Sequence, residues 1–343
     1  MKSLRIGVLG CANIAKQFAR DVAQTSSVSI QAVASRDLAK ARDFAQTFGL
    51  DRYHGSYEAL LADAALDAIY IPLPNSMHAD WAVRAMQAGK HVLCEKPLAL
   101  NLAEVTRMFE VAEKHKVMLL EAYPYWFQPQ TRDLLACLRP DQIGEIRSMQ
   151  ACFGFTLANP GTNIRMKPSL GGGSLLDAGS YTISIIRLVM QCAPERVMAQ
   201  ANWAESGVDI SMSATLFYAD GRTAQMSCAM NTANHRRAVI VGSQGTVETE
   251  YLNHTSDTDA HPWGYLPSQL KVRKGIANSI PFEEIKSASG SGFRFAAEAF
   301  AKVVLNGDRA AIQRAAAASK DIAATLDAIE ASARSGLMIN VVK

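Results

Sequence analysis

The chain lacks any apolar run long enough to span a bilayer, and its six cysteines include no closely spaced pair. Scattered cysteines exclude a disulfide framework and a cysteine-based zinc site, so we expect reduced thiols and no bound metal. The formal net charge is only +3 and no basic cluster stands out, which argues against nucleic-acid binding. Because no signal peptide precedes the first strand-like run, we expect a cytoplasmic protein without membrane contact.

Strand-like and helical segments alternate over the first third of the chain, whose 343 residues suggest two domains. The expected strands are 4–9, 28–34, 66–72, 91–94 and 117–122, and the expected helices are 13–22, 38–48, 77–87 and 102–115. Such alternation predicts an α/β fold with a doubly wound parallel sheet of the Rossmann type, which we assign to residues 1–122.

The pattern changes after Tyr123. The later strand-like runs are 146–155, 195–204, 209–218, 222–230 and 237–249, followed by alanine-rich helices at 293–305 and 310–334. They predict a substrate-binding α+β domain over residues 123–343 with a mixed, largely antiparallel open sheet. Runs such as 210–214 and 224–228 would leave an apolar sheet face that needs cover, so we expect a homodimer or a higher homo-oligomer.

A glycine-bearing turn joins the first strand to the first helix. Gly10 takes the first glycine position of the dinucleotide-binding pattern, whereas alanines occupy the next two. A helix N-terminus at this point favours an anion, so the turn is expected to hold a pyrophosphate. The residues expected to bind it are Gly10, Cys11, Ala12, Asn13 and Ile14. The alternative is a simple turn between strand and helix.

The end of the second strand predicts the type of cofactor. NAD sites usually place Asp or Glu there to bind the ribose hydroxyls, but this chain has Ser35 and Arg36, with Lys40 one turn later. A hydroxyl, a guanidinium and an ammonium suit a 2′-phosphate, so NADP(H) is favoured over NAD(H). Asp37 is an unfavourable neighbour for a phosphate, although it would also make a good helix N-cap. Alternatively, Arg36 and Lys40 are solvated surface charges.

Two distant segments carry side chains suited to proton transfer. Lys96 lies in Glu95-Lys96-Pro97, at the carboxyl end of a strand, where open α/β sheets bind ligands. Asp177 and Tyr181 follow a run of three glycines and, being four residues apart, would share one face of a helix. An amine, a phenol and a carboxylate can exchange the proton of a substrate hydroxyl while hydride moves. Otherwise, Lys96 is a solvated strand end and Tyr181 a core tyrosine.

Three motifs in this order resemble the glucose–fructose oxidoreductase, inositol dehydrogenase and rhizopine-catabolism (Gfo/Idh/MocA) family over nearly the whole chain. They are, in chain order, Pro-Asn-x-x-His at 74–78, Glu-Lys-Pro at 95–97 and the glycine run with Asp-x-Gly-x-Tyr at 171–181. Tyr181 stands where inositol dehydrogenases have His. The chain therefore looks most similar to the branch of trans-dihydrodiol dehydrogenases, D-xylose dehydrogenases and sugar ketoreductases.

The resemblance implies a role for each matching residue. Tyr181 would be the principal acid and base, Lys96 would orient the substrate hydroxyl and share its proton, and Asp177 would bind substrate or the lysine. The residues implied on the nicotinamide side are Leu73, Asn75, His78 and Glu95. In the segment 123–130, Phe127 and Gln128 replace an Arg and a His that are common in the family, which removes two polar groups expected in the pocket.

These features predict an NADP(H)-dependent oxidoreductase. It would move hydride between the nicotinamide and a secondary alcohol or carbonyl of a sugar, a sugar derivative or a cyclic diol. A non-catalytic NADP(H)-binding regulator or sensor is the alternative, although it would not need both Lys96 and Tyr181. A hydrolase that uses NAD transiently is a third possibility, which the non-acidic end of the second strand disfavours.

Overall fold

The computed structural model describes residues 3–258 and 264–342. The chain divides into two compact units. The first contains Met1–Pro124 and Ser291–Ser319, and the second contains Tyr125–Gly290 and Lys320–Lys343. Among the described residues, no helix has both the length and the apolar character needed to cross a membrane. The cytoplasmic location stays a prediction.

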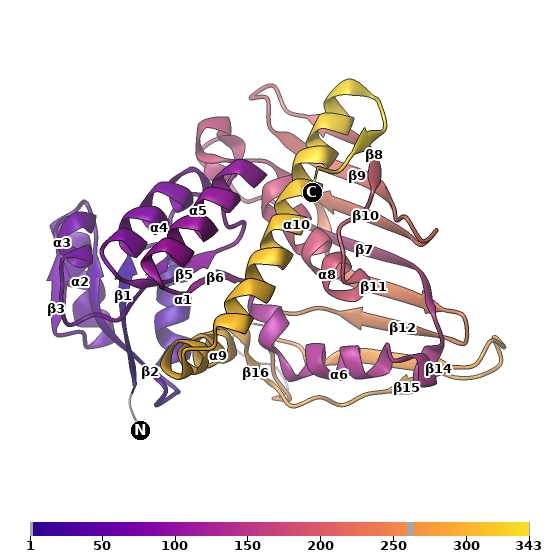
Figure 1. The fold of residues 1–343 in the computed structure, drawn as a ribbon, viewed down its shortest axis with the longest axis horizontal. Helices are drawn as coiled ribbons and strands as arrows, with labels where there is room; N and C mark the ends of the chain where they lie inside the picture. Colours follow the sequence, from indigo (N-terminus) through magenta and orange to yellow (C-terminus); the bar gives the residue numbers. More distant parts are fainter. Residues whose placement is uncertain (1–2, 259–263, 343) are drawn as a thin grey trace. The chain divides into compact units, whose positions relative to one another are not determined.

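The first unit is built on a six-stranded sheet in the order β3-β2-β1-β4-β5-β6, in which every pairing is parallel (Figure 1). The strands are β1 (Leu4–Leu9), β2 (Val28–Ala34), β3 (Arg52–His54), β4 (Ala68–Ile71), β5 (His91–Glu95) and β6 (Leu119–Ala122). The helices are α1 (Asn13–Val22), α2 (Leu38–Phe48), α3 (Tyr57–Leu61), α4 (His78–Gln87), α5 (Leu102–His115) and α9 (Gly292–Asn306). This strand order is that of a Rossmann fold, so the predicted parallel sheet is confirmed.

The central strands are buried on both faces, which explains why their sequences are apolar without alternation. Every residue of β4, β5 and β6 is buried except His91 at the start of β5. Two elements lie outside the sequence prediction. The edge strand β3 has three residues and α3 has five, and both are too short to show a periodic pattern.

Helix α9 returns to the first unit from late in the chain. Its buried side chains include Phe293, Ala297 and Phe300, and the helix packs on α1, β2 and β6. The sequence-based division places this segment with residues 123–343, whereas the structure packs Ser291–Ser319 with the cofactor-binding half. Sequence order could not reveal this, because a helix with an apolar stripe can pack on any complementary surface. Helix α10 (Arg309–Ser335) then continues from the first unit into the second.

The second unit is built on a nine-stranded sheet in the order β15-β14-β12-β11-β7-β10-β9-β8-β17. Only β7 and β10 pair in parallel among the pairings described, so the predicted mixed, largely antiparallel sheet is confirmed. Its strands are β7 (Ile146–Thr156), β8 (Arg196–Trp203), β9 (Asp209–Phe217), β10 (Thr223–Ala229), β11 (Asn231–Gly242), β12 (Gly245–Glu250), β14 (Gln269–Lys274), β15 (Glu283–Glu284) and β17 (Ile339–Asn340). The remaining elements are α6 (Pro129–Cys137), α7 (Pro140–Ile143), α8 (Ser180–Met190), β13 (His254–Thr255) and β16 (Gly290–Ser291).

The expected single strand over 237–249 is a hairpin. Strands β11 and β12 pair antiparallel around Ser243 and Gln244, and Val241 lies opposite Thr246. The buried positions change from even (Ala238, Ile240) to odd (Val247, Thr249) across this turn, and that change of phase marks the reversal.

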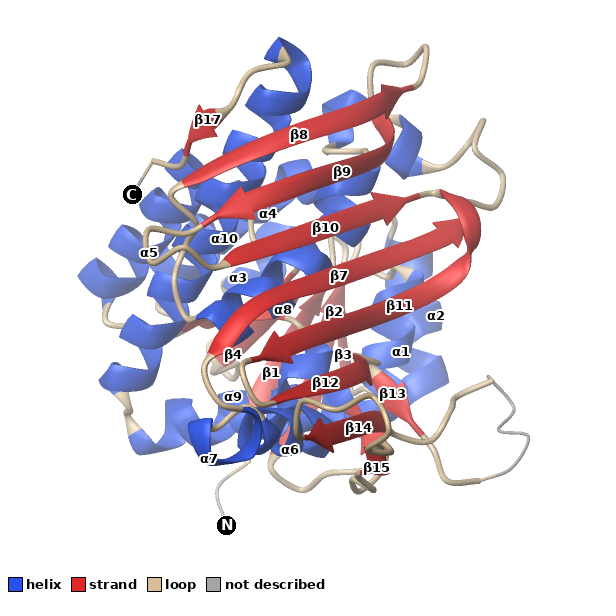
Figure 2. Ribbon diagram, turned by 90° about the vertical axis from the view of Figure 1, so that its right-hand side faces the viewer, coloured by secondary structure: helices blue, strands red, loops and turns tan. Residues whose placement is uncertain are grey.

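One face of the nine-stranded sheet carries α8, which packs on β7 and β10, and the other face is open (Figure 2). Met212, Met226 and Cys228 are buried, whereas Ser213 and Gln225 on the same strands are exposed. The expectation of an apolar open face is therefore wrong, because the apolar members of each alternating run point toward the helices. The homo-oligomer therefore cannot be argued from an apolar sheet face, and it stays a prediction.

Candidate functional site

The turn between β1 and α1 has the geometry of an anion site. Gly10 adopts a φ of 116°, and a Cβ at this position would come within 3.0 Å of Leu73 Cδ2, so a side chain is excluded. Helix α1 begins after Ala12, whose side chain provides no capping hydrogen bond. The first backbone N–H groups of the helix, which include those of Asn13 and Ile14, therefore have no side-chain acceptor at their N-cap. Such groups suit a phosphate.

The side chains after β2 separate into two roles. Asp37 caps α2, because its carboxylate accepts hydrogen bonds from the backbone N–H groups of Ala39 and Lys40, at 3.0 and 3.3 Å. This resolves the unfavourable neighbour noted in the sequence, since the carboxylate already serves the helix. Arg36 is exposed and interacts with the Tyr57 hydroxyl. Burial raises the pKa of Tyr57, and the Arg36 guanidinium opposes that rise.

Ser35, Arg36 and Lys40 thus form a donor set with no acidic residue in the ribose-binding position. The Ser35 hydroxyl is buried and accepts a hydrogen bond from the Asp37 backbone N–H at 3.2 Å. Cys11 connects this set to the pyrophosphate turn, because its Sγ lies 3.6 Å from the Lys40 carbonyl oxygen. The turn and the donor set together fit a phosphorylated dinucleotide.

His78 is fully buried and joins two loops at the carboxyl edge of the sheet. Its Nδ1 lies 2.8 Å from the carbonyl oxygen of Pro97, and its Nε2 lies 2.8 Å from that of Leu73. The side chain therefore holds the loop after β4, which also contains Asn75, against the loop after β5. Any effect of His78 on a cofactor would pass through these two backbone segments. Burial lowers its pKa, and the two carbonyl oxygens oppose that change.

Lys96 is half-buried among ionisable groups at the end of β5, and the Lys96–Pro97 peptide bond is cis. Glu95 accepts a 2.6 Å hydrogen bond from the Tyr70 hydroxyl, so its carboxylate is held within the sheet. Glu121 accepts hydrogen bonds from Leu98 N–H at 2.9 Å and from Ser319 Oγ at 2.6 Å. Burial raises the pKa of Glu121, whereas these hydrogen bonds and the Lys96 charge act in the opposite direction.

In the second unit, Asp177 lies in a π-helical turn (Leu175–Gly179) that leads into α8. The preceding glycines allow close packing there, because a Cβ at Gly172 would meet the Arg165 carbonyl oxygen at 2.4 Å. Asp177 forms an ion pair with Arg165, and its Oδ2 lies 2.5 Å from Arg165 Nε. The carboxylate is therefore paired with an arginine of its own unit.

Tyr181 lies in the first turn of α8, beside a guanidinium surrounded by rings. Its hydroxyl accepts a 2.9 Å hydrogen bond from Asn253 Nδ2, and Arg236 Nη2 donates to Asn253 Oδ1 at 3.3 Å. The Cζ of Arg236 lies 4.1 Å from the centroid of the Tyr181 ring. The other rings around it, with their distances from Cζ, are Tyr251 (4.6 Å), Phe153 (4.9 Å) and Tyr125 (5.3 Å).

The neighbouring tyrosines are poor candidates for proton transfer. The Tyr125 hydroxyl lies 2.7 Å from Ser184 Oγ and accepts a hydrogen bond from Trp126 Nε1 at the same distance. Tyr251 donates to the Cys152 carbonyl oxygen at 2.9 Å. Burial is the largest cause of a raised pKa at both Tyr125 and Tyr251. Tyr181 is the one of these three whose hydroxyl is held by a side-chain amide.

Gln128 is a structural residue of the second unit. It is buried, and its Nε2 donates to the carbonyl oxygens of Asn253 at 2.8 Å and Gly290 at 2.9 Å. From the sequence, Gln128 was expected to remove a polar group from the pocket, because it replaces a His that is common in the family. Its amide instead holds the backbone of the residue that bonds Tyr181.

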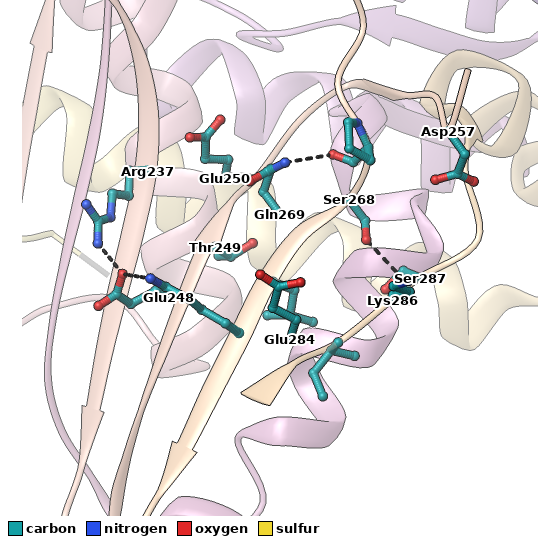
Figure 3. Close-up of a pocket in the computed structure, with 14 residues that line it drawn as sticks. Arg237, Glu248, Thr249, Glu250, Asp257, Ser268, Gln269, Glu284, Lys286 and Ser287 are labelled. Atoms are coloured by element: carbon teal, nitrogen blue, oxygen red, sulfur yellow. Dashed lines mark hydrogen bonds and ion pairs between the residues drawn. The ribbon is translucent and has the colours of Figure 1, made fainter. Parts of the chain in front are cut away.

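A hollow of about 750 Å³ lies elsewhere in the second unit, along β12, β14 and β15 (Figure 3). Glu248 in its wall pairs with both Arg237 and Lys271, so its negative charge is compensated by two cations. None of the predicted catalytic residues lines it. Among the described residues, no group of His, Cys, Asp and Glu side chains could hold a metal ion.

Comparison with known proteins shows the family. Residues 4–123 match the oxidoreductase family with an NAD-binding Rossmann fold, and residues 131–248 match the GFO/IDH/MocA C-terminal domain. The chain is 35% identical to D-xylose 1-dehydrogenase (NADP(+)) 2 of Haloferax volcanii, over 98% of this chain and 100% of that protein. The chain belongs to the Gfo/Idh/MocA oxidoreductase family.

Two further relatives support this assignment. Trans-1,2-dihydrobenzene-1,2-diol dehydrogenase of Danio rerio is 32% identical over 89% of each chain. A 3-ketoreductase from Actinomadura kijaniata, solved with NADP and TDP-benzene, superimposes with a TM-score of 0.86 and 30% identity, over 96% of this chain and 98% of that one. The family resemblance inferred from the three motifs is therefore confirmed. The prediction that the chain is an enzyme with an NAD(P)-binding domain is confirmed as well.

The sequence reasoning missed Arg236 and Asn253. A signal for Arg236 was present, because it shares the two-residue period of Ala238 and Ile240, which are buried, whereas Arg237 has the opposite parity. A cation at an inward position of a strand is unusual and marks a candidate site. No comparable pattern marks Asn253, which lies in a loop.

We expect acid to destabilise the cofactor-binding unit through His78. Its folded-state pKa lies below its unfolded value of about 6.5. The unfolded state therefore binds the proton more readily, and the free energy of unfolding falls as the pH drops below about 6.5. Urea unfolding between pH 7.5 and 5 should show a smaller loss in His78→Asn than in wild type. The exposed control His235→Asn should behave as wild type, and an equal pH dependence in all three proteins would contradict this assignment.

Proposed function

We propose that this protein is an NADP(H)-dependent oxidoreductase that moves hydride between the nicotinamide and a secondary alcohol or carbonyl. The substrate would be a sugar, a sugar derivative or a cyclic diol. The observation that carries the proposal is the Tyr181 hydroxyl, held by Asn253 beside the Arg236 guanidinium, in a chain that also has an NAD(P)-binding Rossmann domain. The named activities of the relatives, a xylose dehydrogenase, a dihydrodiol dehydrogenase and a 3-ketoreductase, support the substrate class.

Lys96 and Tyr181 would handle the substrate proton. When bound, NADP(H) supplies the hydride acceptor or donor. The Tyr181 phenolate would take the proton of the substrate hydroxyl during oxidation, and the phenol would return it during reduction. The Lys96 ammonium would orient that hydroxyl and stabilise negative charge on its oxygen. Asp177 would contribute by holding Arg165 next to the same helix.

A non-catalytic regulator, the alternative considered from the sequence, would need the cofactor turn but not the residues around Tyr181. The arrangement around Tyr181 argues against a purely structural tyrosine, since Tyr125 and Tyr251 already fill that role nearby. Binding of NADPH without turnover of any carbonyl sugar or cyclic diketone would favour the regulator.

We expect NADP(H) to bind more tightly than NAD(H), because Arg36 and Lys40 can reach a 2′-phosphate. Arg36→Ala should weaken NADP(H) binding by roughly 1.5–3 kcal/mol, the range for a hydrogen bond to a charged group, with little effect on NAD(H). Fluorescence titration of both cofactors measures this. Arg42→Ala, on helix α2 that follows Arg36, is the matched control. Tighter binding of NAD(H) by wild type would refute the preference.

We expect Tyr181→Phe and Lys96→Met each to lower turnover by about 10²–10⁴-fold, the usual contribution of a positioned acid or base. Cofactor affinity should change little in either variant. Residues that act as one unit are not additive, so the double variant should be little worse than the weaker single one. The exposed Tyr53→Phe serves as control. Near-normal turnover in Tyr181→Phe would remove the tyrosine from the mechanism.

We also propose a homodimer formed through the open face of the nine-stranded sheet, whose exposed side chains include the polar Ser213 and Gln225. Within one chain, Gln150 of β7 donates to Gln225 of β10 on this face at 3.1 Å. Light scattering should show a dimer at micromolar concentration. Gln225→Arg should dissociate it by placing charge at the interface, whereas Gln46→Arg on α2 should not. A monomeric wild type would contradict the proposal.

A further inference from the structure

Arg236 carries a positive charge that the described part of the second unit does not neutralise. Its single hydrogen bond there goes to an amide oxygen, that of Asn253. Its Nε–H is buried and has no acceptor among the described residues. Four aromatic rings surround the guanidinium, with their centroids 4.1–5.3 Å from Cζ. Rings attract a cation weakly, but they accept no conventional hydrogen bond from its N–H groups.

The carboxylates near this arginine are already paired. Asp177, one helical turn before Tyr181, forms an ion pair with Arg165. Glu248 pairs with Arg237 and Lys271. Arg237 is exposed and faces the side of β11 opposite to Arg236, because side chains alternate along a strand. In the part of the second unit that the structure describes, the guanidinium next to Tyr181 is therefore held in place without an anionic partner.

The position of Arg236 is set by sheet register. It lies opposite Phe153 of β7, on the face of the sheet that carries α8. Asn253 joins its guanidinium to the Tyr181 hydroxyl by two hydrogen bonds. A group bound by Arg236 would thus lie close to the Tyr181 hydroxyl, which is proposed to transfer the proton, because Asn253 bonds to both residues.

We propose that the substrate carries an anionic group, a carboxylate or a phosphate, which Arg236 binds while Tyr181 acts on a hydroxyl of the same molecule. This inference rests on the proposed function and narrows it to sugar acids or sugar phosphates. An anion would accept a charge-assisted hydrogen bond from the Arg236 guanidinium, whose Nε–H has no acceptor among the described residues. In the oxidative direction the carbinol would lose hydride to NADP+ and its hydroxyl proton to the Tyr181 phenolate, which yields the carbonyl, NADPH and the neutral phenol. The anionic group is unchanged.

Sugars that differ only at carbon 6 test this directly: D-glucose, D-glucuronate and D-glucose 6-phosphate, with D-galactose and D-galacturonate as a second pair. Binding to the NADP(H)-loaded enzyme is measured by calorimetry, and turnover by NADPH absorbance. Wild type should bind at least one anionic sugar roughly tenfold or more tightly than its neutral counterpart, as expected for a charge-assisted hydrogen bond. The two anions separate a carboxylate site from a phosphate site.

Arg236→Gln should abolish that preference, and Arg236→Lys should retain part of it because the charge remains. Arg237→Gln, the neighbour on the opposite face, should keep the full preference. Circular dichroism and an unchanged Kd for NADPH show that each variant is folded. Equal binding of neutral and anionic sugars by wild type would overturn the proposal. So would failure of every anion to bind, or a preference that survives in Arg236→Gln.

The same data separate this inference from the proposed function. An Arg236-dependent preference in binding, without turnover in either direction, would support anion recognition and contradict the oxidoreductase assignment. Turnover of neutral sugars, with no dependence on Arg236, would support the oxidoreductase and overturn anion recognition.

Discussion

The alternation of side chains along β11 is the constraint on which the chemistry of the second unit depends. It sends Arg237 to the open face and Arg236 to the face that carries α8, opposite Phe153. A shift of one residue in the register would turn Arg236 to the open face and place either His235 or Arg237 opposite Phe153. The register of the nine-stranded sheet therefore determines that Arg236, and not Arg237, lies beside Tyr181.

The first unit differs, because its backbone groups are suited to hold a highly charged dinucleotide. Gly10 allows the turn to pass close to Leu73, and the uncapped start of α1 leaves N–H groups for a phosphate. His78 then joins the loops after β4 and β5. The residues proposed to bind the cofactor thus depend on local geometry at strand ends, whereas those proposed to recognise the substrate depend on pairings between distant strands.

This difference explains what could be predicted from the sequence. Strand ends of a parallel sheet meet at one edge, so Gly10, Ser35 and Lys96 could be grouped from their order alone. The pairing of α9 with the first unit, and the meeting of Arg236 with Tyr181, depend on contacts between residues far apart in sequence. Gln128 was misread for the same reason, because its partners, Asn253 and Gly290, lie more than a hundred residues away.

The central claim is that Tyr181 and Lys96 serve one substrate hydroxyl. The most direct test is a crystal structure of the ternary complex of Tyr181→Phe with NADP+ and a tight-binding sugar, compared with the wild-type complex. The account predicts that the reacting oxygen of the substrate lies about 2.6–3.2 Å from both the Tyr181 hydroxyl and Lys96 Nζ in wild type. In the variant, the substrate should keep its place. A reacting oxygen remote from either group, with its carbon facing the nicotinamide, would contradict the account.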